Sequence, residues 1–208
     1  MLADAAVAAF LLVCLGCFVS INLHNILVVH RHRNFEKAYA EVERPSGLVV
    51  ALAAVGTIVY FLVASLYLLL VLTECTAVLL ALSLRFQPLL MFNMQILGLI
   101  LTGVGYFLFI WSVIVRGWLA VSWAMTKDHR LVTWGPYRYV RHPSYLGYFL
   151  MFVGLFFLWP SPLTLFPLMA IPGYLRVTIE EERLLMRRFG DQFLEYQRRT
   201  GRFIPRSR

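Results

Sequence analysis

The sequence predicts an all-α integral membrane protein with about five transmembrane helices, a polar cytoplasmic loop and a C-terminal interfacial helix. Three observations support this fold class: 60% of the 208 residues are hydrophobic, only 14% are charged, and the apolar residues form long runs. Soluble domains contain about 45–50% apolar residues, and their cores cannot bury a much larger fraction. The composition therefore excludes a soluble globular protein and a disordered chain, and three cysteines are too few for a secreted disulfide scaffold.

The apolar runs define the membrane path. The first three are about long enough to cross a ~30 Å hydrocarbon layer as helices, and the last two flank a Pro-Ser-Pro turn that predicts a helical hairpin. No basic residue precedes the first run, so we interpret it as a permanent span rather than a cleaved signal peptide. The apolar stretch 77–84 is too short to cross. The predicted spans, within one membrane domain over residues 1–208, cover residues 5–29, 48–72, 89–115, 144–159 and 163–179.

The distribution of basic residues predicts the orientation of the chain. Four lysines and arginines lie between the first two spans, five lie from Arg116 to Arg141, and nine follow from Arg176 onward. The link between the second and third spans contains only Arg85, and the proline turn contains none. Because cytoplasmic segments carry an excess of Lys and Arg, this pattern predicts an outside N-terminus and an inside C-terminus.

Two short motifs favour structural interpretations. Cys14 and Cys17 form a C-x-x-C pair inside an apolar span, without a second pair, so packing is favoured over redox chemistry or zinc binding. His30 and His32 stand among arginines, with no carboxylate or cysteine at ligand spacing. We interpret them as part of a basic collar beside the membrane, and we predict no metal site.

Glycine and arginine patterns exclude two further classes. The glycines at 98, 103 and 105 form no nucleotide-binding fingerprint after a strand, and they predict close helix packing instead. Arginines in 187–199 alternate with apolar residues at roughly helical spacing. This pattern fits a surface helix on anionic lipid better than a nucleic-acid site.

Two polar segments carry more information. Residues 127–147 place histidines, arginines, tyrosines and two Gly/Pro-fixed turns between the third and fourth spans. A basic interfacial loop would explain the arginines and tyrosines, but not the fixed turns or His142 at a span entrance. The second segment, Glu180-Glu181-Glu182, follows the fifth span. Taken alone, its spacing from Thr178 favours the capping box of a helix N-terminus.

Taken together, these segments share the motifs of one known family. They contain Leu-Val-Thr-x-Gly-Pro-Tyr at 131–137, Arg-His-Pro-Ser-Tyr-x-Gly at 141–147 and Glu-Glu-x-x-Leu at 181–185. The chain thus resembles the isoprenylcysteine carboxyl methyltransferase family and its prokaryotic, integral membrane relatives. The resemblance is close from about residue 127 to 205, whereas the first three spans match only in hydropathy and order.

The resemblance implies a membrane enzyme that transfers a methyl group from S-adenosyl-L-methionine to a lipid-associated or small hydrophobic acceptor, leaving S-adenosyl-L-homocysteine. The family acceptor is a prenylcysteine-type carboxylate. The cofactor would bind in a cytoplasmic pocket formed by residues 122–147 and 176–205. Carried over by position, the cofactor-binding residues would be His129, Leu131, Val132, Tyr137, Arg141, His142, Pro143, Ser144, Tyr145, Glu181 and Glu182.

The resemblance also implies two catalytic residues, Glu181 and Arg176, of which Arg176 would face the substrate. Counted back from Phe189, however, Arg176 lies one residue beyond the family's substrate arginine, and Val177 takes that place. Helix rotation could compensate for this offset, or another arginine could serve.

The residue chemistry agrees with methyl transfer. Attack on a sulfonium is an in-line displacement in which positioning and exclusion of water dominate. Glu181 can hold cationic or hydroxyl groups, and Arg141 and His142 can hold a carboxylate or a ribose. The aromatic faces of Trp134 and Tyr145, like that of Tyr137, suit adenine and a sulfonium.

Several functions stay open at this point. Phospholipid amines and small thiols are alternative acceptors, because an apolar pocket does not identify the acceptor. A membrane reductase that uses NADPH is a different class, although an acidic cluster disfavours a polyanionic cofactor. A lipid-binding membrane protein without enzymatic activity is the remaining alternative. The predicted partners are a hydrophobic or prenylated substrate and membrane lipids, and no nucleic acid.

Overall fold

The structure is a computed structural model that describes residue 2 and residues 4–33, 47–117 and 130–206. In these ranges the elements are helices, and a single pair of residues, Val140 and Gly201, forms an isolated bridge. The elements are α1 (Asp4–Arg33), α2 (Gly47–Leu72), α3 (Thr76–Leu82), α4 (Pro88–Arg116), the 3-10 helix η2 (Gly135–Arg138), α5 (Pro143–Leu158), the 3-10 helix η3 (Pro162–Met169), α6 (Ala170–Phe189) and α7 (Asp191–Arg199). The predicted all-α fold class is confirmed.

Within the described ranges, four helical segments are long and apolar enough to cross a membrane. They are Asp4–Leu27, Val50–Leu72, Pro88–Arg116 and Pro162–Phe189, and α5 is a shorter apolar helix of 16 residues. Many large apolar side chains point outward from these helices, as the 57–64% exposed fractions of Leu23, Leu62 and Ile100 show. Lipid accepts such side chains, so the chain is a multi-pass membrane protein.

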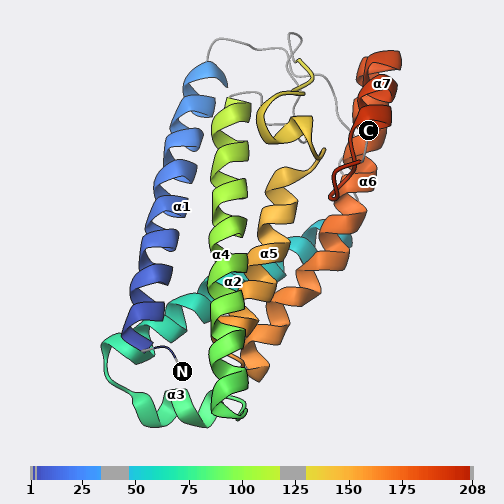
Figure 1. The fold of residues 1–208 in the computed structure, drawn as a ribbon. Coiled ribbons are helices and arrows are strands. Elements are labelled where there is room, and N and C mark those ends of the chain that lie inside the picture. The colour runs from blue at the N-terminus through green and yellow to red at the C-terminus, as the bar shows by residue number, and fades with distance from the viewer. Residues whose placement is uncertain (1, 3, 34–46, 118–129, 207–208) are drawn as a thin grey trace.

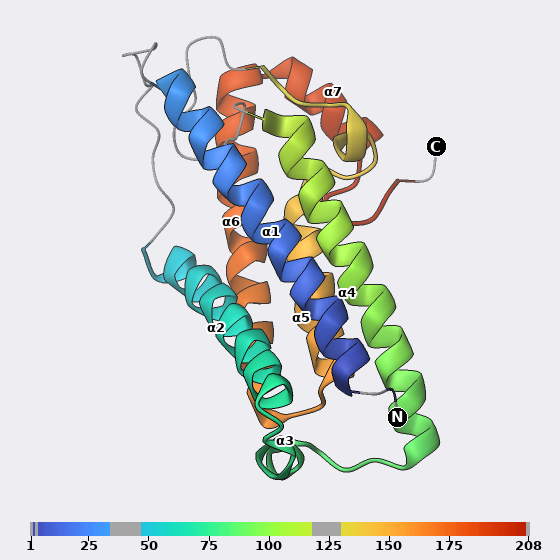
Figure 2. The ribbon, with the colours of Figure 1, turned by 90° about the vertical axis from the view of Figure 1, so that its left-hand side faces the viewer.

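Most of the long helices run roughly along one axis of the molecule. In Figure 1, α1, α4, α5 and α6 extend from the end with the N-terminus to the end with α7, and α2 passes behind them. Figure 2, turned by 90°, shows α1 in front of α5 and α6. The short helix α3 lies at the N-terminal end, where the stretch 77–84 was predicted not to cross. The segment after residue 130 and α7 therefore meet at the opposite end.

Glycines let α4 and α5 approach closely. Gly98 and Gly105 on α4 face Gly154 and Gly147 on α5, and a Cβ atom built on Gly105 would lie 2.7 Å from the carbonyl oxygen of Gly147. The same atom on Gly103 would meet nothing nearer than 3.7 Å. The predicted close packing is thus confirmed for Gly98 and Gly105, while Gly103 makes an ordinary contact with α1.

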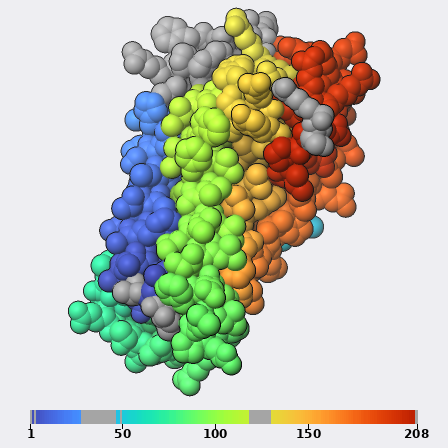
Figure 3. All heavy atoms as spheres, viewed as in Figure 1, coloured from blue at the N-terminus to red at the C-terminus, as the bar shows by residue number. Residues whose placement is uncertain are grey.

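The helix that contains the last predicted span, 163–179, is longer than that span. The 3-10 helix η3 leads into α6, which continues through Glu180-Glu181-Glu182 to Phe189 and ends at Gly190, where φ is +50°. The three acidic residues therefore lie inside a helix that begins at Ala170, and the capping-box interpretation is wrong. Figure 3 shows the segment after residue 130 packed between α4 and the C-terminal segment.

Candidate active site

Two turns position the polar segment before α5. Gly135 begins η2 with a φ of +60°, and a Cβ atom there would lie 2.8 Å from a methyl group of Val115. Pro143 is the first residue of α5, a position where its missing N–H removes no helical hydrogen bond, and His142 is the N-cap residue. Both Gly/Pro-fixed turns that the sequence predicts are therefore present.

Backbone hydrogen bonds join this polar segment, residues 130–142, to the C-terminal tail, residues 200–206. The N–H of Arg141 donates to the carbonyl of Gly201 at 2.9 Å, and the N–H of His142 donates to the carbonyl of Arg202 at 3.2 Å. The guanidinium of Arg141 also donates to the carbonyl of Thr200. Residues from two distant parts of the sequence are thereby held at one place.

The helix α7 packs against the same segment. Phe193 is fully buried and contacts Leu131, and the hydroxyl of Tyr196 donates to the carbonyl of Tyr137 at 2.7 Å. Burial raises the pKa of Tyr196, so its hydroxyl stays protonated. These two apolar residues of α7 therefore face protein rather than lipid.

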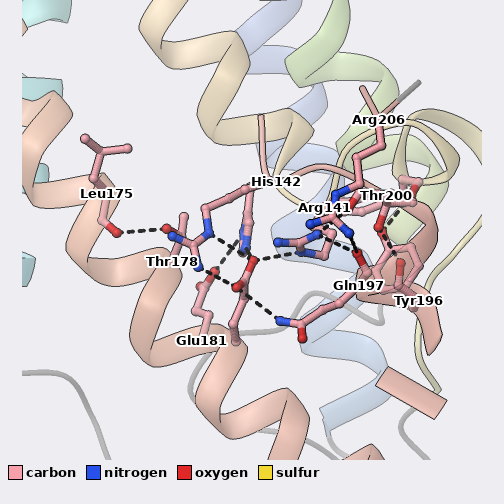
Figure 4. A network of polar contacts seen from close by, with 12 residues as sticks. Arg141, His142, Leu175, Thr178, Glu181, Tyr196, Gln197, Thr200 and Arg206 are labelled. Atoms are coloured by element: carbon pink, nitrogen blue, oxygen red, sulfur yellow. Dashed lines mark hydrogen bonds and ion pairs between the residues drawn. The ribbon is translucent and has the colours of Figure 1, made fainter. Parts of the chain in front are cut away.

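The carboxylate of Glu182 is buried and has several polar partners, of which Arg141, His142 and Gln197 are labelled in Figure 4. Its Oε1 accepts from Nε of Arg141 at 2.8 Å and its Oε2 accepts from Arg202 at 2.6 Å. The hydrogen bonding between Arg202 and Glu182 raises the pKa of Arg202. Nε2 of His142 lies 3.2 Å from Oε1, and Nε2 of Gln197 donates to Oε2 at 3.3 Å. Both carboxylate oxygens are thus occupied by protein groups.

Glu181, the neighbouring carboxylate, has fewer partners. The hydroxyl of Tyr145 donates to its Oε1 at 2.7 Å, and Nδ1 of His142 lies 3.5 Å from its Oε2. Glu181 is 7% exposed. His142 therefore stands between the two carboxylates of α6, and only Glu181 retains capacity for a further partner.

Glu181 lines a cavity of about 60 Å³. Ligand sites in proteins combine apolar walls with a few polar groups. The lining has this character and consists of Arg116, Arg130, Leu131, Val132, Tyr137, Arg141, His142, Ser144, Tyr145, Glu181, Leu185, Phe193 and Tyr196.

Most of the predicted cofactor-binding residues meet at this cavity. Pro143 and Glu182 do not line it, and Glu182 is held by the arginines instead. Trp134 is also absent from the lining and is 49% exposed. His129 lies outside the described residues. The predicted residues that line the cavity are Leu131, Val132, Tyr137, Arg141, His142, Ser144, Tyr145 and Glu181.

The structure does not bring Arg176 to the cavity. Arg176 is exposed on α6, whereas its neighbour Val177 is 3% exposed and faces the interior. The predicted offset of one residue is thus not compensated by rotation of the helix, because each step along an α-helix turns the side chain by about 100°.

Two arginines line the cavity without having been predicted there. Arg130 follows the predicted His129, and Arg116 ends α4. The basic character of Arg116 at the inner end of a span was visible in the sequence, but it indicated only orientation. Nothing in the spacing showed that the end of the third span lies beside Glu181.

Two polar atoms of the cavity lack partners. Nε of Arg116 and the hydroxyl of Tyr137 are buried and have no hydrogen-bond partner among the described residues, although Ser112 and Ser144 lie near the hydroxyl. Burial raises the pKa of Tyr137 despite the opposing effect of Arg116, so the hydroxyl keeps its proton. The cavity thus offers an unused cation and an unused hydroxyl donor.

The comparisons with known proteins concern this same region. Residues 93–192 match the family model described as phospholipid methyltransferase. The protein-S-isoprenylcysteine O-methyltransferase of Tribolium castaneum is 38% identical over 84 residues, which are 38% of this chain and 29% of that protein. A solved structure of the eukaryotic intramembrane Ras methyltransferase ICMT has a TM-score of 0.48 and 25% identity, covering 78% of this chain and 54% of that one.

A relative with a different name aligns with a slightly larger part of this chain. The nickel-cobalt-cadmium resistance protein NccN of Alcaligenes xylosoxydans xylosoxydans is 38% identical over 98 residues, which are 46% of this chain and 45% of that protein. Within the described ranges, no group of three or more His, Cys, Asp or Glu residues is arranged to hold a metal ion.

The matched segments cover less than half of each of these curated relatives. The family match includes α5 and α6, which contribute His142, Tyr145 and Glu181 to the cavity. Residues 93–192 are therefore similar to the phospholipid methyltransferase family, and the similarity to a protein-S-isoprenylcysteine O-methyltransferase agrees with the resemblance that the motifs predict.

Proposed function

We propose that this chain is a membrane methyltransferase that uses S-adenosylmethionine and acts on a lipid-associated or small hydrophobic acceptor. The acceptor that we favour is a prenylcysteine-type carboxylate. The observation that carries this proposal is the cavity, whose wall joins the carboxylate of Glu181 to aromatic and apolar side chains at one end of the membrane helices.

The lining suits S-adenosylmethionine in its chemistry. Glu181 has acceptor capacity beyond its bonds to Tyr145 and His142, which suits the hydroxyl or ammonium groups of that cofactor. Leu131, Val132 and the aromatic rings beside them suit adenine. When bound, the cofactor would supply an electrophilic methyl group on a sulfonium.

The protein groups would act mainly by positioning. A carboxylate acceptor is already nucleophilic, so the reaction needs no general base in the protein, and alignment and exclusion of water provide the acceleration. Tyr145 and His142 hold the Glu181 carboxylate in place from α5. Glu181 would in turn fix the cofactor, and the Glu182 network would hold α6, α7 and the polar segment together around it.

The site lies where a membrane acceptor and a soluble cofactor can meet. The helices that end at the cavity carry outward-facing leucines and isoleucines, whereas α7 and the tail beside it carry arginines. A hydrophobic acceptor would approach from the bilayer, and the cofactor would approach from the basic side, which the charge distribution predicts to be cytoplasmic.

Calorimetry on detergent-purified protein tests the cofactor. We expect saturable binding of S-adenosylmethionine, no binding of NADPH, and a loss of about tenfold or more in affinity in Glu181→Gln, since a charge-assisted hydrogen bond disappears. Glu180→Gln is the matched control, because Glu180 pairs with exposed Arg183 outside the cavity. Its affinity should equal that of the wild type.

Other results would favour the alternatives. Binding of NADPH in place of S-adenosylmethionine would indicate a membrane reductase, and binding of neither to folded protein would favour a lipid-binding role. Given cofactor binding, methyl transfer to a prenylcysteine acid, a phospholipid amine or a hydrophobic thiol, compared in one assay, identifies the acceptor. We expect the acid to be methylated.

A further inference from the structure

Arg116 lines the cavity with one nitrogen of its side chain unpaired among the described residues. It is the last residue of α4, lines the cavity, and has a buried Nε with no hydrogen-bond partner among the described residues. An unsatisfied buried donor is destabilising, and more so when it is charged. A guanidinium held in this way has no evident role in the stability of the fold, and it is suited to receive an anionic ligand.

The groups that interact electrostatically with Arg116 lie on η2, α5 and α6. Its guanidinium interacts electrostatically with Tyr137, Tyr145, Glu181 and Tyr148, the last of which lies one helical turn further along α5 than Tyr145. This direction agrees with helix geometry, because helical side chains lean toward the N-terminal end of their helix. The charge of Arg116 therefore lies near Glu181 and near two tyrosines of α5.

The other cations of the region are used or directed elsewhere. Arg141 donates to Glu182 and to the carbonyl of Thr200, and Arg130 is exposed at the mouth. On α6, Arg176 is exposed and Val177 takes the inward position. Within the part of the chain that the structure describes, Arg116 is the cation of the cavity whose buried Nε has no hydrogen-bond partner, and its side chain as a whole is half-buried.

We propose that Arg116, together with the hydroxyl of Tyr137, binds the carboxylate of the methyl acceptor. This inference rests on the proposed function and deepens it, because it assigns the acceptor an anionic head group and assigns recognition of that group to α4. A guanidinium presents paired donors to a carboxylate, and the protonated Tyr137 hydroxyl adds a third. Arg116 would thus supply the positive charge that α6 lacks, because Val177 takes the place of the family's substrate arginine.

The test compares a carboxylate with its amide. N-acetyl-S-farnesylcysteine and its carboxamide are titrated calorimetrically into the wild type, Arg116→Gln and the matched control Arg176→Gln, each saturated with S-adenosylhomocysteine so that no transfer occurs. We expect the wild type and Arg176→Gln to prefer the acid by about 10- to 100-fold. Arg116→Gln should lose that preference, and Arg116→Lys should keep part of it.

The affinity for S-adenosylhomocysteine, measured on the same proteins, shows whether Arg116 binds the carboxylate of the acceptor or that of the cofactor. We expect it to be equal in all four proteins, which also shows that the variants fold. A parallel loss in Arg116→Gln would assign Arg116 to the carboxylate of the cofactor and overturn our inference.

Further outcomes contradict the inference directly. An acid preference that persists in Arg116→Gln, or that disappears in Arg176→Gln, overturns it while the proposed function stands. Failure of the wild type to bind the farnesyl acid overturns it together with the prenylcysteine acceptor. Failure to bind S-adenosylhomocysteine would instead refute the proposed function itself.

Discussion

Glu181 and Glu182 are adjacent carboxylates of α6 with different surroundings. Glu182 accepts hydrogen bonds from Arg141, Arg202 and Gln197, so its oxygens are saturated within the protein. Among the described residues, Glu181 makes close polar contacts with Tyr145 and His142, and it lines the cavity. One residue therefore holds the site together, and the other is available to a ligand.

This division predicts different results for substitution of the two residues. Glu182→Gln removes the charge that balances Arg141, whose side chain is 10% exposed, and loss of one partner of a buried ion pair typically costs on the order of 3 kcal/mol. We expect a clear fall in the unfolding temperature of the detergent-purified protein. Glu181→Gln should lower ligand affinity and change the unfolding temperature much less.

The control for this prediction is Glu180→Gln. Glu180 pairs with Arg183 through side chains that are 41% and 63% exposed, and exposed ion pairs contribute about 0–1 kcal/mol. Its unfolding temperature should match the wild type. Equal stability of Glu182→Gln and the wild type would show that the hydrogen bonds of Glu182 do not stabilise the site.

Sequence motifs predicted much of the cavity, but not the division of roles within it. Leu131, Tyr137, His142 and Tyr145 belong to continuous motifs, so a resemblance could indicate them together. Arg116 belongs to no motif, and its place depends on how α4 packs beside α5 and η2. That packing is a tertiary property which spacing along the chain does not encode.

At the scale of elements, the helix pair α4 and α5 sets the position of both Arg116 and Tyr145. The two helices approach through glycines, and the backbone of each fills the space where a side chain would stand on the other. Helix association in a membrane depends on such packing, because lipid provides no hydrophobic drive between helices.

We predict that Gly105→Ala is destabilising whereas Gly103→Ala is not. The new methyl group at Gly105 would meet the carbonyl oxygen of Gly147 at 2.7 Å, and backbone atoms cannot move aside without separating the helices. Overpacking of this kind costs about 1–3 kcal/mol. At Gly103 the nearest atom is 3.7 Å away, so the higher helix propensity of alanine should leave stability equal or slightly higher.

Unfolding temperatures of the two variants in the same detergent check this prediction. Because Gly105 lies about three turns from Arg116 on α4, we also expect Gly105→Ala to weaken S-adenosylhomocysteine binding through displacement of α5. Similar stability of both variants would mean that the helices separate at little cost.

The ends of a helix could be predicted where the apolar run in the sequence and the helix end at the same residues. The predicted spans 48–72 and 89–115 agree with α2 and α4 within one residue at each end. For the predicted span 163–179 the helix and the apolar run end at different places, because α6 continues beyond its apolar part to Phe189. Its last turns pack on protein rather than in lipid, so hydropathy could not mark their end.

At the scale of the whole molecule, the polar segment, α7 and the tail gather at one end, and α3 lies at the other. The basic residues follow the same division, since Arg198, Arg199, Arg202 and Arg206 lie with α7 and the tail, whereas Arg85 lies between α3 and α4. The sequence therefore predicts that the cavity end is cytoplasmic and that the α3 end is outside.

Thiol labelling can test this orientation, because the chain provides a natural probe at one end. Cys75 is exposed between α2 and α3, and Arg206 is exposed in the tail beyond α7. A membrane-impermeant maleimide should label Cys75 in intact cells, and Cys75→Ser should abolish that signal. A cysteine introduced by Arg206→Cys in the Cys75→Ser protein should react only after permeabilisation. The opposite pattern would place the cavity outside, where S-adenosylmethionine made in the cytosol could not reach Glu181.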